Sequence, residues 1–384
     1  MRTIRRLIYG EVLASIAFVA VGFLALFFFF DLVDELQYLG KNAAGAVSND
    51  ANTYQIRHAL MYVALLVPSH FYELVPISVL IGTIFVMARL AQSSEYTILR
   101  TSGLEPWRAL RLLLSLGAFF VVLCFAVGDY LAPAADRTAQ LLKARYQGRI
   151  TVGQTGAWLK EKQTYTSYVV NVGALSADNE MQGVRVFEFD NKGLLASITQ
   201  SPRARFARDD SWELDNASRT EFTVKAGQPT ATDGGRESAR ISISSINSFR
   251  WPTGISAEMV SVAVLKPERM GTLDLFSYVR HLNANGQSAQ RYEIEFWKKV
   301  FYPLSCLVMV VLALPFAYLH FRSGGIAGYV FGGVMIGISF FLLNNVFGYI
   351  GNLQTWQPWL AAAAPGLLYM AISLGAIGWL VLRR

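Results

Sequence analysis

Six long apolar runs constrain this chain more than any other feature of its sequence. Each can supply roughly the 20 residues that a helix needs to cross a hydrocarbon core of about 30 Å. The composition agrees, because 53% of the residues are hydrophobic and only 16% are charged. The runs are Val12–Phe30, Leu74–Ala88, Leu112–Val127, Val300–Leu319, Ile326–Tyr349 and Trp359–Leu382. We therefore predict a membrane α-helical bundle of six transmembrane helices.

The first apolar run follows Arg2, Arg5 and Arg6, as the core of a cleavable signal peptide would. It is longer than the apolar core of a signal peptide, and it ends in four phenylalanines and Asp31 rather than in small residues. We interpret it as a retained transmembrane helix.

The segment between the third and fourth runs alternates polar and apolar residues and predicts an inserted all-β domain. Turn signals such as Asp190-Asn191-Lys192-Gly193 separate its strands. The predicted strands are Tyr165–Val172, Val184–Phe189, Leu194–Thr199, Ala204–Ala207, Trp212–Leu214, Arg219–Val224, Ala239–Ser244 and Met259–Leu265. This spacing is typical of a sandwich or a jelly roll, which the pattern does not distinguish. A hydrophilic helix is predicted at Thr272–Ala284.

These elements divide the chain into four parts. Residues 1–133 hold helices one to three, 134–270 the jelly-roll-like domain, 271–296 a connecting helix, and 297–384 helices four to six.

The basic residues of the short loops predict the orientation. Ten Lys and Arg residues lie on the side of the two termini, against only Lys41 and Arg57 on the other. Both termini are therefore expected in the cytoplasm and the β domain outside. The formal net charge of +7 comes largely from these signals and does not indicate nucleic-acid binding.

A short cytoplasmic helix is predicted between the second and third transmembrane helices, at about 93–103. Ser94 is a suitable N-cap, Glu95 suits the positive end of the helix dipole, and Gly103 suits the C-terminal stop. Its apolar residues, Ile98 and Leu99, need a partner. That partner is either the groove of an ATPase or the lipid surface.

No catalytic, metal or cofactor site is evident. The sequence lacks a phosphate-binding loop, so any ATP hydrolysis, with its magnesium ion, is expected in a partner subunit. The four histidines have no metal-ligand spacing, and Cys124 and Cys306 both fall inside predicted transmembrane helices. Glu73 and Asp129 are the candidate intramembrane charges, and each is close enough to a helix end to reach the interface.

The chain resembles the lipopolysaccharide-export permease family over nearly its whole length. The residues that carry the resemblance are Val33-Asp34-Glu35-Leu36, Leu90-Ala91-Gln92-Ser93-Ser94-Glu95, Ser102-Gly103, Ala132-Pro133, Gly156-Ala157-Trp158, Arg291-Tyr292, Phe296-Trp297-Lys298-Lys299 and Asn345-Val346-Phe347-Gly348. The Gly-Ala-Trp, Phe-Trp-Lys-Lys and Asn-Val-Phe-Gly stretches are more similar to the LptG branch than to the LptF branch.

The resemblance implies a permease subunit of an ABC transporter that extracts lipopolysaccharide from the bacterial inner membrane. The implied partners are an LptF-type permease, a cytoplasmic LptB-type ATPase dimer, and LptC- and LptA-type periplasmic bridge proteins. Helices one and five would form a lateral gate. The implied residues are Ser94, Glu95, Ile98, Leu99 and Arg100 for ATPase coupling, Lys41, Arg137, Lys143 and Arg145 for substrate binding, and Phe27, Phe30, Gly328 and Gly332 for the gate.

Two observations leave alternatives open. Asp31, Gln37 and Tyr38 occupy positions where the family resemblance implies lysines, so the transfer of the substrate-binding rim is uncertain. The glycines of the fifth helix could equally serve ordinary helix packing. The other functions considered are an LptF-type permease, a lipoprotein-release or efflux permease, and a non-transporting scaffold whose β domain binds a partner. The efflux class places its exterior domain between helices one and two, unlike this chain.

Overall fold

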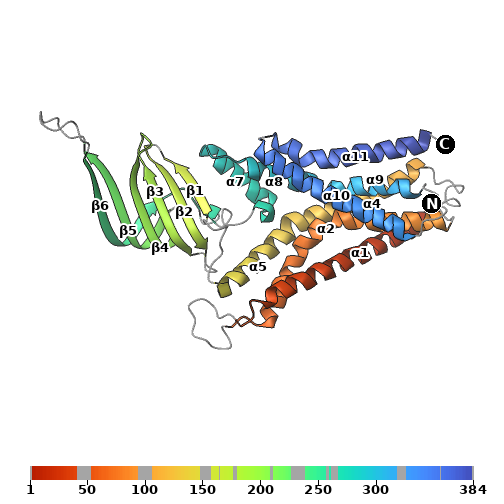
Figure 1. Cartoon of the computed structure of the whole chain (residues 1–384), viewed down its shortest axis with the longest axis horizontal. Helices are drawn as coiled ribbons and strands as arrows, with labels where there is room; N and C mark the ends of the chain where they lie inside the picture. Colours follow the sequence, from red (N-terminus) through yellow and green to blue (C-terminus); the bar gives the residue numbers. More distant parts are fainter. Residues whose placement is uncertain are drawn as a thin grey trace.

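The structure is a computed structural model that describes residues 2–40, 53–93, 106–147, 157–163, 165–175, 180–207, 211–225, 238–256, 259–260, 267–317, 326–354 and 356–382. It has two parts. Long helices form a bundle, and an antiparallel sheet stands beyond the end of the bundle that is far from both chain termini (Figure 1). We call that end of the bundle the sheet end.

Five helical spans are long and apolar enough to cross a membrane, by length and composition. They comprise α1 (Arg2–Leu36), α2 (Ile56–Gln92), α4 (Pro106–Ala126) with its continuation, α10 (Ile326–Leu353) and α11 (Pro358–Leu382). A sixth span consists of α8 (Gln290–Phe301) and α9 (Ser305–Ala313), which meet at a 47° bend and are followed by a short 3-10 helix, η4 (Leu314–Ala317). Pro303 lies in the break and lacks the N–H that a continuous helix needs. The prediction of a helical membrane bundle with an inserted β domain is confirmed.

Helix α2 is the central helix of the bundle. It contacts α1 at Gly82, where an added Cβ would lie only 2.7 Å from Ile16. On another side it contacts α10, where Cβ atoms at Gly333 and Gly337 would lie 3.0 Å from isoleucines of α2. Small residues at these crossings allow the helix backbones to approach closely. The α10 glycines at 333 and 337 therefore serve helix packing.

The third span is continuous beyond the membrane-length run. Helix α4 passes through a π-helical turn, η2 (Val127–Leu131), into α5 (Ala132–Gln147). The segment from residue 134, which we expected to begin the β domain, is therefore helical as far as Gln147. Its physical reason is local, because alanine, leucine, lysine, arginine and glutamine dominate α5 and all favour helix.

The inserted domain is a six-stranded sheet in which every strand pairs antiparallel with the next in the chain. The strands are β1 (Ala157–Lys162), β2 (Ser167–Leu175), β3 (Met181–Phe189), β4 (Leu195–Ala207), β5 (Ser211–Lys225) and β6 (Ser238–Pro252). Strands β4 and β5 each join two of the short strands that we predicted. Within the described strands the order is that of a meander, without the crossovers of a complete jelly roll. Met259 and Val260, predicted to begin a strand, are helical.

One face of the sheet packs against the helix that leads back to the bundle. This helix, α7, has the predicted bounds Thr272–Ala284. Its Leu275 is fully buried in the same core as Trp212 of β5, whose indole N–H donates to the carbonyl oxygen of Ile255 at 2.9 Å. The core of the sheet and the start of α8 are therefore continuous.

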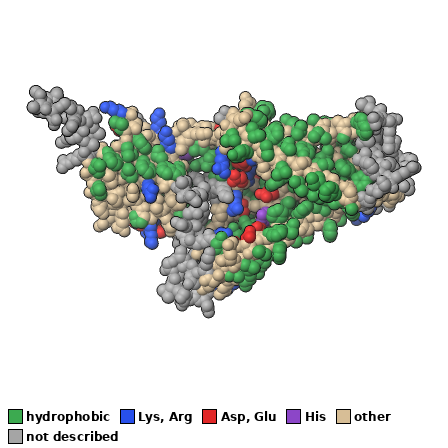
Figure 2. Space-filling view, viewed as in Figure 1, with side chains coloured by type: hydrophobic (Ala, Val, Ile, Leu, Met, Phe, Trp, Pro, Cys, Tyr) green, Lys and Arg blue, Asp and Glu red, His purple; other side chains and the backbone are tan. Residues whose placement is uncertain are grey.

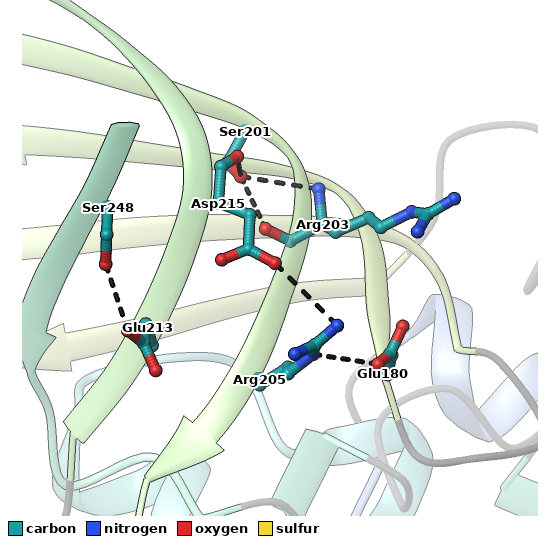
Figure 3. A network of polar contacts seen from close by, with 7 residues as sticks. All are labelled: Glu180, Ser201, Arg203, Arg205, Glu213, Asp215 and Ser248. Atoms are coloured by element: carbon teal, nitrogen blue, oxygen red, sulfur yellow. Dashed lines mark hydrogen bonds and ion pairs between the residues drawn. The ribbon is translucent and has the colours of Figure 1, made fainter. Parts of the chain in front are cut away.

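Polar contacts brace the middle strands where β5 is interrupted (Figure 3). Asn216 has a positive φ of 50°, a conformation that asparagine tolerates better than most residues. Beside it, the Ser201 hydroxyl lies 2.6 Å from the carbonyl oxygen of Asp215. The Arg205 guanidinium contacts the Glu180 carboxylate at 2.8 Å. These contacts hold β4 and β5 in register across the irregularity.

Candidate functional site

A polar cavity of about 590 Å³ opens at the sheet end of the bundle. Its walls come from α1, α2, η2, α5, α8, α10 and a 3-10 turn, η3 (Pro267–Arg269), that precedes α7. Figure 2 shows acidic and basic side chains gathered in a hollow between the apolar surface of the helices and the sheet. A charged hollow beside an apolar bundle can accommodate the polar part of an amphiphile.

Carboxylates outnumber basic groups in the walls of this cavity. Seven acidic residues line it: Asp31, Asp34, Glu35, Glu73, Asp136, Glu268 and Glu295. Its basic lining residues are Lys143, Arg269, Lys298 and Lys299, and His70 also contributes to the wall. The cavity therefore has an excess of acidic groups among the residues that the structure describes.

The Lys143 ammonium is engaged within the protein. It lies 3.1 Å from the carboxylate of Glu35, which is only 3% exposed. The rings of Tyr38 and Tyr62 lie 4.8 and 4.6 Å from the same ammonium. Tyr54 donates a 2.9 Å hydrogen bond to the other carboxylate oxygen of Glu35. This cluster ties the end of α1 to α5.

Tyr54 is held in its protonated, donating form. Burial, together with the hydrogen bond to the Glu35 carboxylate, raises the pKa of the Tyr54 hydroxyl well above its ordinary value. The Glu35 carboxylate therefore keeps two donors, one neutral and one charged.

A second pair joins α1 to α2 at the cavity wall. The imidazole of His70 lies 2.6 Å from the carboxylate of Asp31. The ring of Phe27, one turn earlier on α1, lies 4.9 Å from the same imidazole. Asp31, at a position where we expected a family lysine, thus makes an internal contact at the cavity.

Lys299 and Asp129 connect the bundle to the sheet domain. The buried Lys299 ammonium donates to the carbonyl oxygen of Gly128 at 3.0 Å, inside the π-helical turn. Asp129 accepts a 2.6 Å hydrogen bond from the backbone N–H of Thr272, the first residue of α7. This contact satisfies one of the N–H groups that a helix start leaves free. Asp129, predicted to be solvated at an interface, instead caps a helix of the connecting segment.

The predicted substrate-binding residues have different surroundings. Lys143 lines the cavity, while Arg137 is directed to α7, where its guanidinium lies 3.0 Å from the Asp274 carboxylate. Lys41 and the side chain of Arg145 lie outside the described residues. The predicted coupling residues Ser94, Glu95, Ile98, Leu99 and Arg100 also lie outside them.

The predicted gate residues lie on α1 and α10, the two helices that pack on different sides of α2. Phe27 and Phe30 are 37% and 57% exposed. No atom of the described chain would lie within 4 Å of a Cβ placed at Gly328 or Gly332. The two glycines therefore present an open helix surface, in contrast to Gly333 and Gly337.

Sequence reasoning missed Asp136, Arg269 and Lys299 as cavity residues. Asp136 carried a usable signal, because it precedes Lys143 by seven residues and therefore shares its face of α5. Arg269 and Lys299 carried none, since a chain fold of more than one hundred residues brings them to α5.

Comparisons with known proteins agree with this architecture. The model of the family "Lipopolysaccharide export system permease LptF/LptG" matches residues 6–383. The chain is 26% identical to the lipopolysaccharide export system permease protein LptG of Escherichia coli K12 over 355 residues, which cover 92% of this chain and 90% of the relative. It is 22% identical to the LptG protein of Haemophilus influenzae over 387 residues, covering 100% of this chain and 99% of the relative. This multi-pass membrane chain, with its inserted β-sheet domain, therefore belongs to the LptF/LptG family of lipopolysaccharide export system permeases.

Proposed function

We propose that this chain is the LptG-type permease subunit of an ABC exporter in the inner membrane of a Gram-negative bacterium. It would take lipopolysaccharide from the membrane and pass it to a periplasmic bridge. The observation that carries the proposal is the polar cavity at the sheet end of an apolar bundle, in a chain that matches the permease family from residue 6 to residue 383. The LptG-type assignment over the LptF type is supported by the relatives, which are LptG proteins.

The chemistry of the two parts fits an amphiphilic substrate. Apolar side chains such as Phe331 and Leu342 of α10 are exposed on the bundle and suit acyl chains. The polar cavity suits a headgroup, since its charged side chains replace the water that the headgroup gives up. The sheet lies directly beyond this cavity and offers the next surface along the chain for the lipid (Figure 1).

The orientation we propose places the sheet in the periplasm and both termini in the cytoplasm. The loop charges support it through the positive-inside tendency. The arrangement of the fold is compatible, because the two termini lie at one end of the bundle and the sheet at the other (Figure 1).

The energy would come from a cytoplasmic LptB-type ATPase dimer, which would hold the ATP and its magnesium ion. Glu95 and its neighbours would couple this chain to the ATPase, and an LptF-type permease would supply the other half of the lipid path. LptC- and LptA-type proteins would receive the lipid. Helices α1 and α10 would separate to admit it, with Phe27 and Phe30 on one side and Gly328 and Gly332 on the other.

Purification of the tagged chain in detergent tests the proposal. Mass spectrometry should identify lipopolysaccharide, a second permease and an ATPase in the same complex. Glu95→Lys should remove the ATPase and leave the second permease bound. The matched charge reversal Glu221→Lys, on the exposed surface of β5, should keep both partners. Isolation of the chain with neither lipopolysaccharide nor an ATPase would refute the exporter assignment, and retention of the ATPase by Glu95→Lys would refute the coupling assignment.

A further inference from the structure

The basic residues that line the polar cavity are already occupied by groups of the protein. Lys143 lies 3.1 Å from the Glu35 carboxylate, and Lys298 lies 2.7 Å from that of Glu295. Lys299 donates to the Gly128 carbonyl oxygen. An anionic ligand would have to compete with these internal contacts, so the described part of this wall is poorly prepared to bind phosphate.

An acidic residue in the same wall lacks the partner that its burial requires. Asp136 is 3% exposed, and its Oδ1 atom has no hydrogen-bond partner in the described chain. The neighbouring hydroxyl of Ser69 is also buried and unpaired there. Buried polar atoms are normally hydrogen-bonded, and an unpaired one costs about 1–3 kcal/mol. Two such acceptors in one cavity wall indicate a ligand that donates hydrogen bonds.

The surroundings of Asp136 favour a positively charged ligand. Glu73, on α2, lies within electrostatic range of Asp136 and is exposed in the cavity wall. Arg269, Lys299 and His70 also influence Asp136, but none of them makes an ion pair with it in the described chain. A donor entering between Asp136 and Glu73 would meet two carboxylates.

We propose that this cavity binds a protonated primary amine carried by the headgroup of the exported glycolipid, with Asp136 and Ser69 accepting its hydrogen bonds. The proposal rests on the lipid-export function above and names the class of headgroup that the chain prefers. An ammonium group has three N–H donors and needs no ring of ligands. The aromatic ring of Tyr62, also in the wall, provides a further surface for a cation.

A bridging divalent cation fits less well. Calcium and magnesium require six or more oxygen ligands, or several waters with tightly placed carboxylates. The described residues contain no group of three acidic, histidine or cysteine side chains arranged to hold a metal ion. The carboxylates of the cavity are numerous but dispersed.

Lipid binding to the full chain tests the proposal. The chain is placed in nanodiscs of phosphatidylglycerol, which carries no amine, and titrated with bisphosphorylated lipid A or with lipid A bearing phosphoethanolamine. We expect about tenfold tighter binding of the amine-bearing lipid, which is the size of one hydrogen bond to a charged group. Asp136→Asn should remove this preference and leave binding of the unmodified lipid unchanged.

Controls separate the proposal from its neighbours. Glu180→Gln, on the sheet, should keep the preference, and Glu73→Gln, at an exposed position, should reduce it and decides the matter should Asp136→Asn not fold. Equal binding of both lipids would overturn the amine proposal alone. A preference that survives both variants, or one that EDTA abolishes, would also overturn it. Binding of neither lipid would instead contradict the proposed export function.

Discussion

The buried pair between Glu35 and Lys143 should contribute measurably to stability. The two charged atoms lie 3.1 Å apart, and the Glu35 side chain is 4% exposed while that of Lys143 is 28% exposed. Coulomb attraction at this distance is about 5 kcal/mol for an effective dielectric constant of 20, before the desolvation of both groups is subtracted. Removing one partner of a fully buried pair costs about 3–5 kcal/mol, and water reaches Lys143 here. We therefore expect Lys143→Met to destabilise the chain by about 2–3 kcal/mol.

A double-mutant cycle isolates this interaction. Lys143→Met, Glu35→Gln and the double variant are unfolded reversibly in mixed detergent and SDS, with tryptophan fluorescence as the signal. We expect a coupling free energy of about 2 kcal/mol, since the double variant leaves no unpaired charge. The exposed pair of Arg137 and Asp274 is the matched control, for which a coupling of under about 1 kcal/mol is expected.

The outcome also decides between two roles for Lys143. A coupling below about 0.5 kcal/mol, with a selective loss of lipopolysaccharide crosslinking in Lys143→Met, would refute the internal role. It would restore the role that family resemblance implied, a direct contact with the substrate.

Two further predictions concern the bundle and the connecting helix. Gly128→Ala should destabilise the chain by about 1–3 kcal/mol, because the added methyl group would overlap the Tyr72 ring; thermal denaturation checks this, and Gly366→Ala, whose Cβ position is open, should not be destabilised. Burial lowers the pKa of His281 below its usual value near 6.5. The unfolded chain therefore takes up the proton first as the pH falls below about 6.5, so stability should decrease toward lower pH, and this slope should be smaller in His281→Gln. A slope that is unchanged in the variant would contradict this reasoning.

The main features of the fold could be predicted from local patterns. Apolar runs of membrane-spanning length do not depend on distant contacts, and neither do the alternating residues of the strands. The helix Thr272–Ala284 was predicted with its observed bounds because its apolar periodicity and its stop at Asn285-Gly286 are local. The long strands β4 and β5 were divided in the prediction, because polar residues within them resemble turns while their backbone pairs with neighbouring strands.

The polar cavity could not be predicted in the same way. Its contacts join residues that are far apart in the chain, such as Asp31 with His70 and Lys299 with Gly128. A charge near a helix end is predicted to be solvated unless its partner is known, which is why Asp129 was expected at an interface. The acidic end of α1 was noticed as a departure from the family. Only the three-dimensional arrangement shows that two of those acids, Asp31 and Glu35, hold α1 to α2 and α5.

Site-specific photocrosslinking tests the central claim, that the polar cavity receives the lipid headgroup. A photoreactive amino acid is placed at Phe341, which lines the cavity on α10, or at Phe119, an exposed apolar residue of α4 that does not line it. Crosslinking to lipopolysaccharide in cells should be strong at position 341 and weak at position 119. In membranes that contain the complete exporter, addition of ATP should lower the signal at position 341. Equal crosslinking at both positions, or a signal at 341 that does not respond to ATP, would contradict the account.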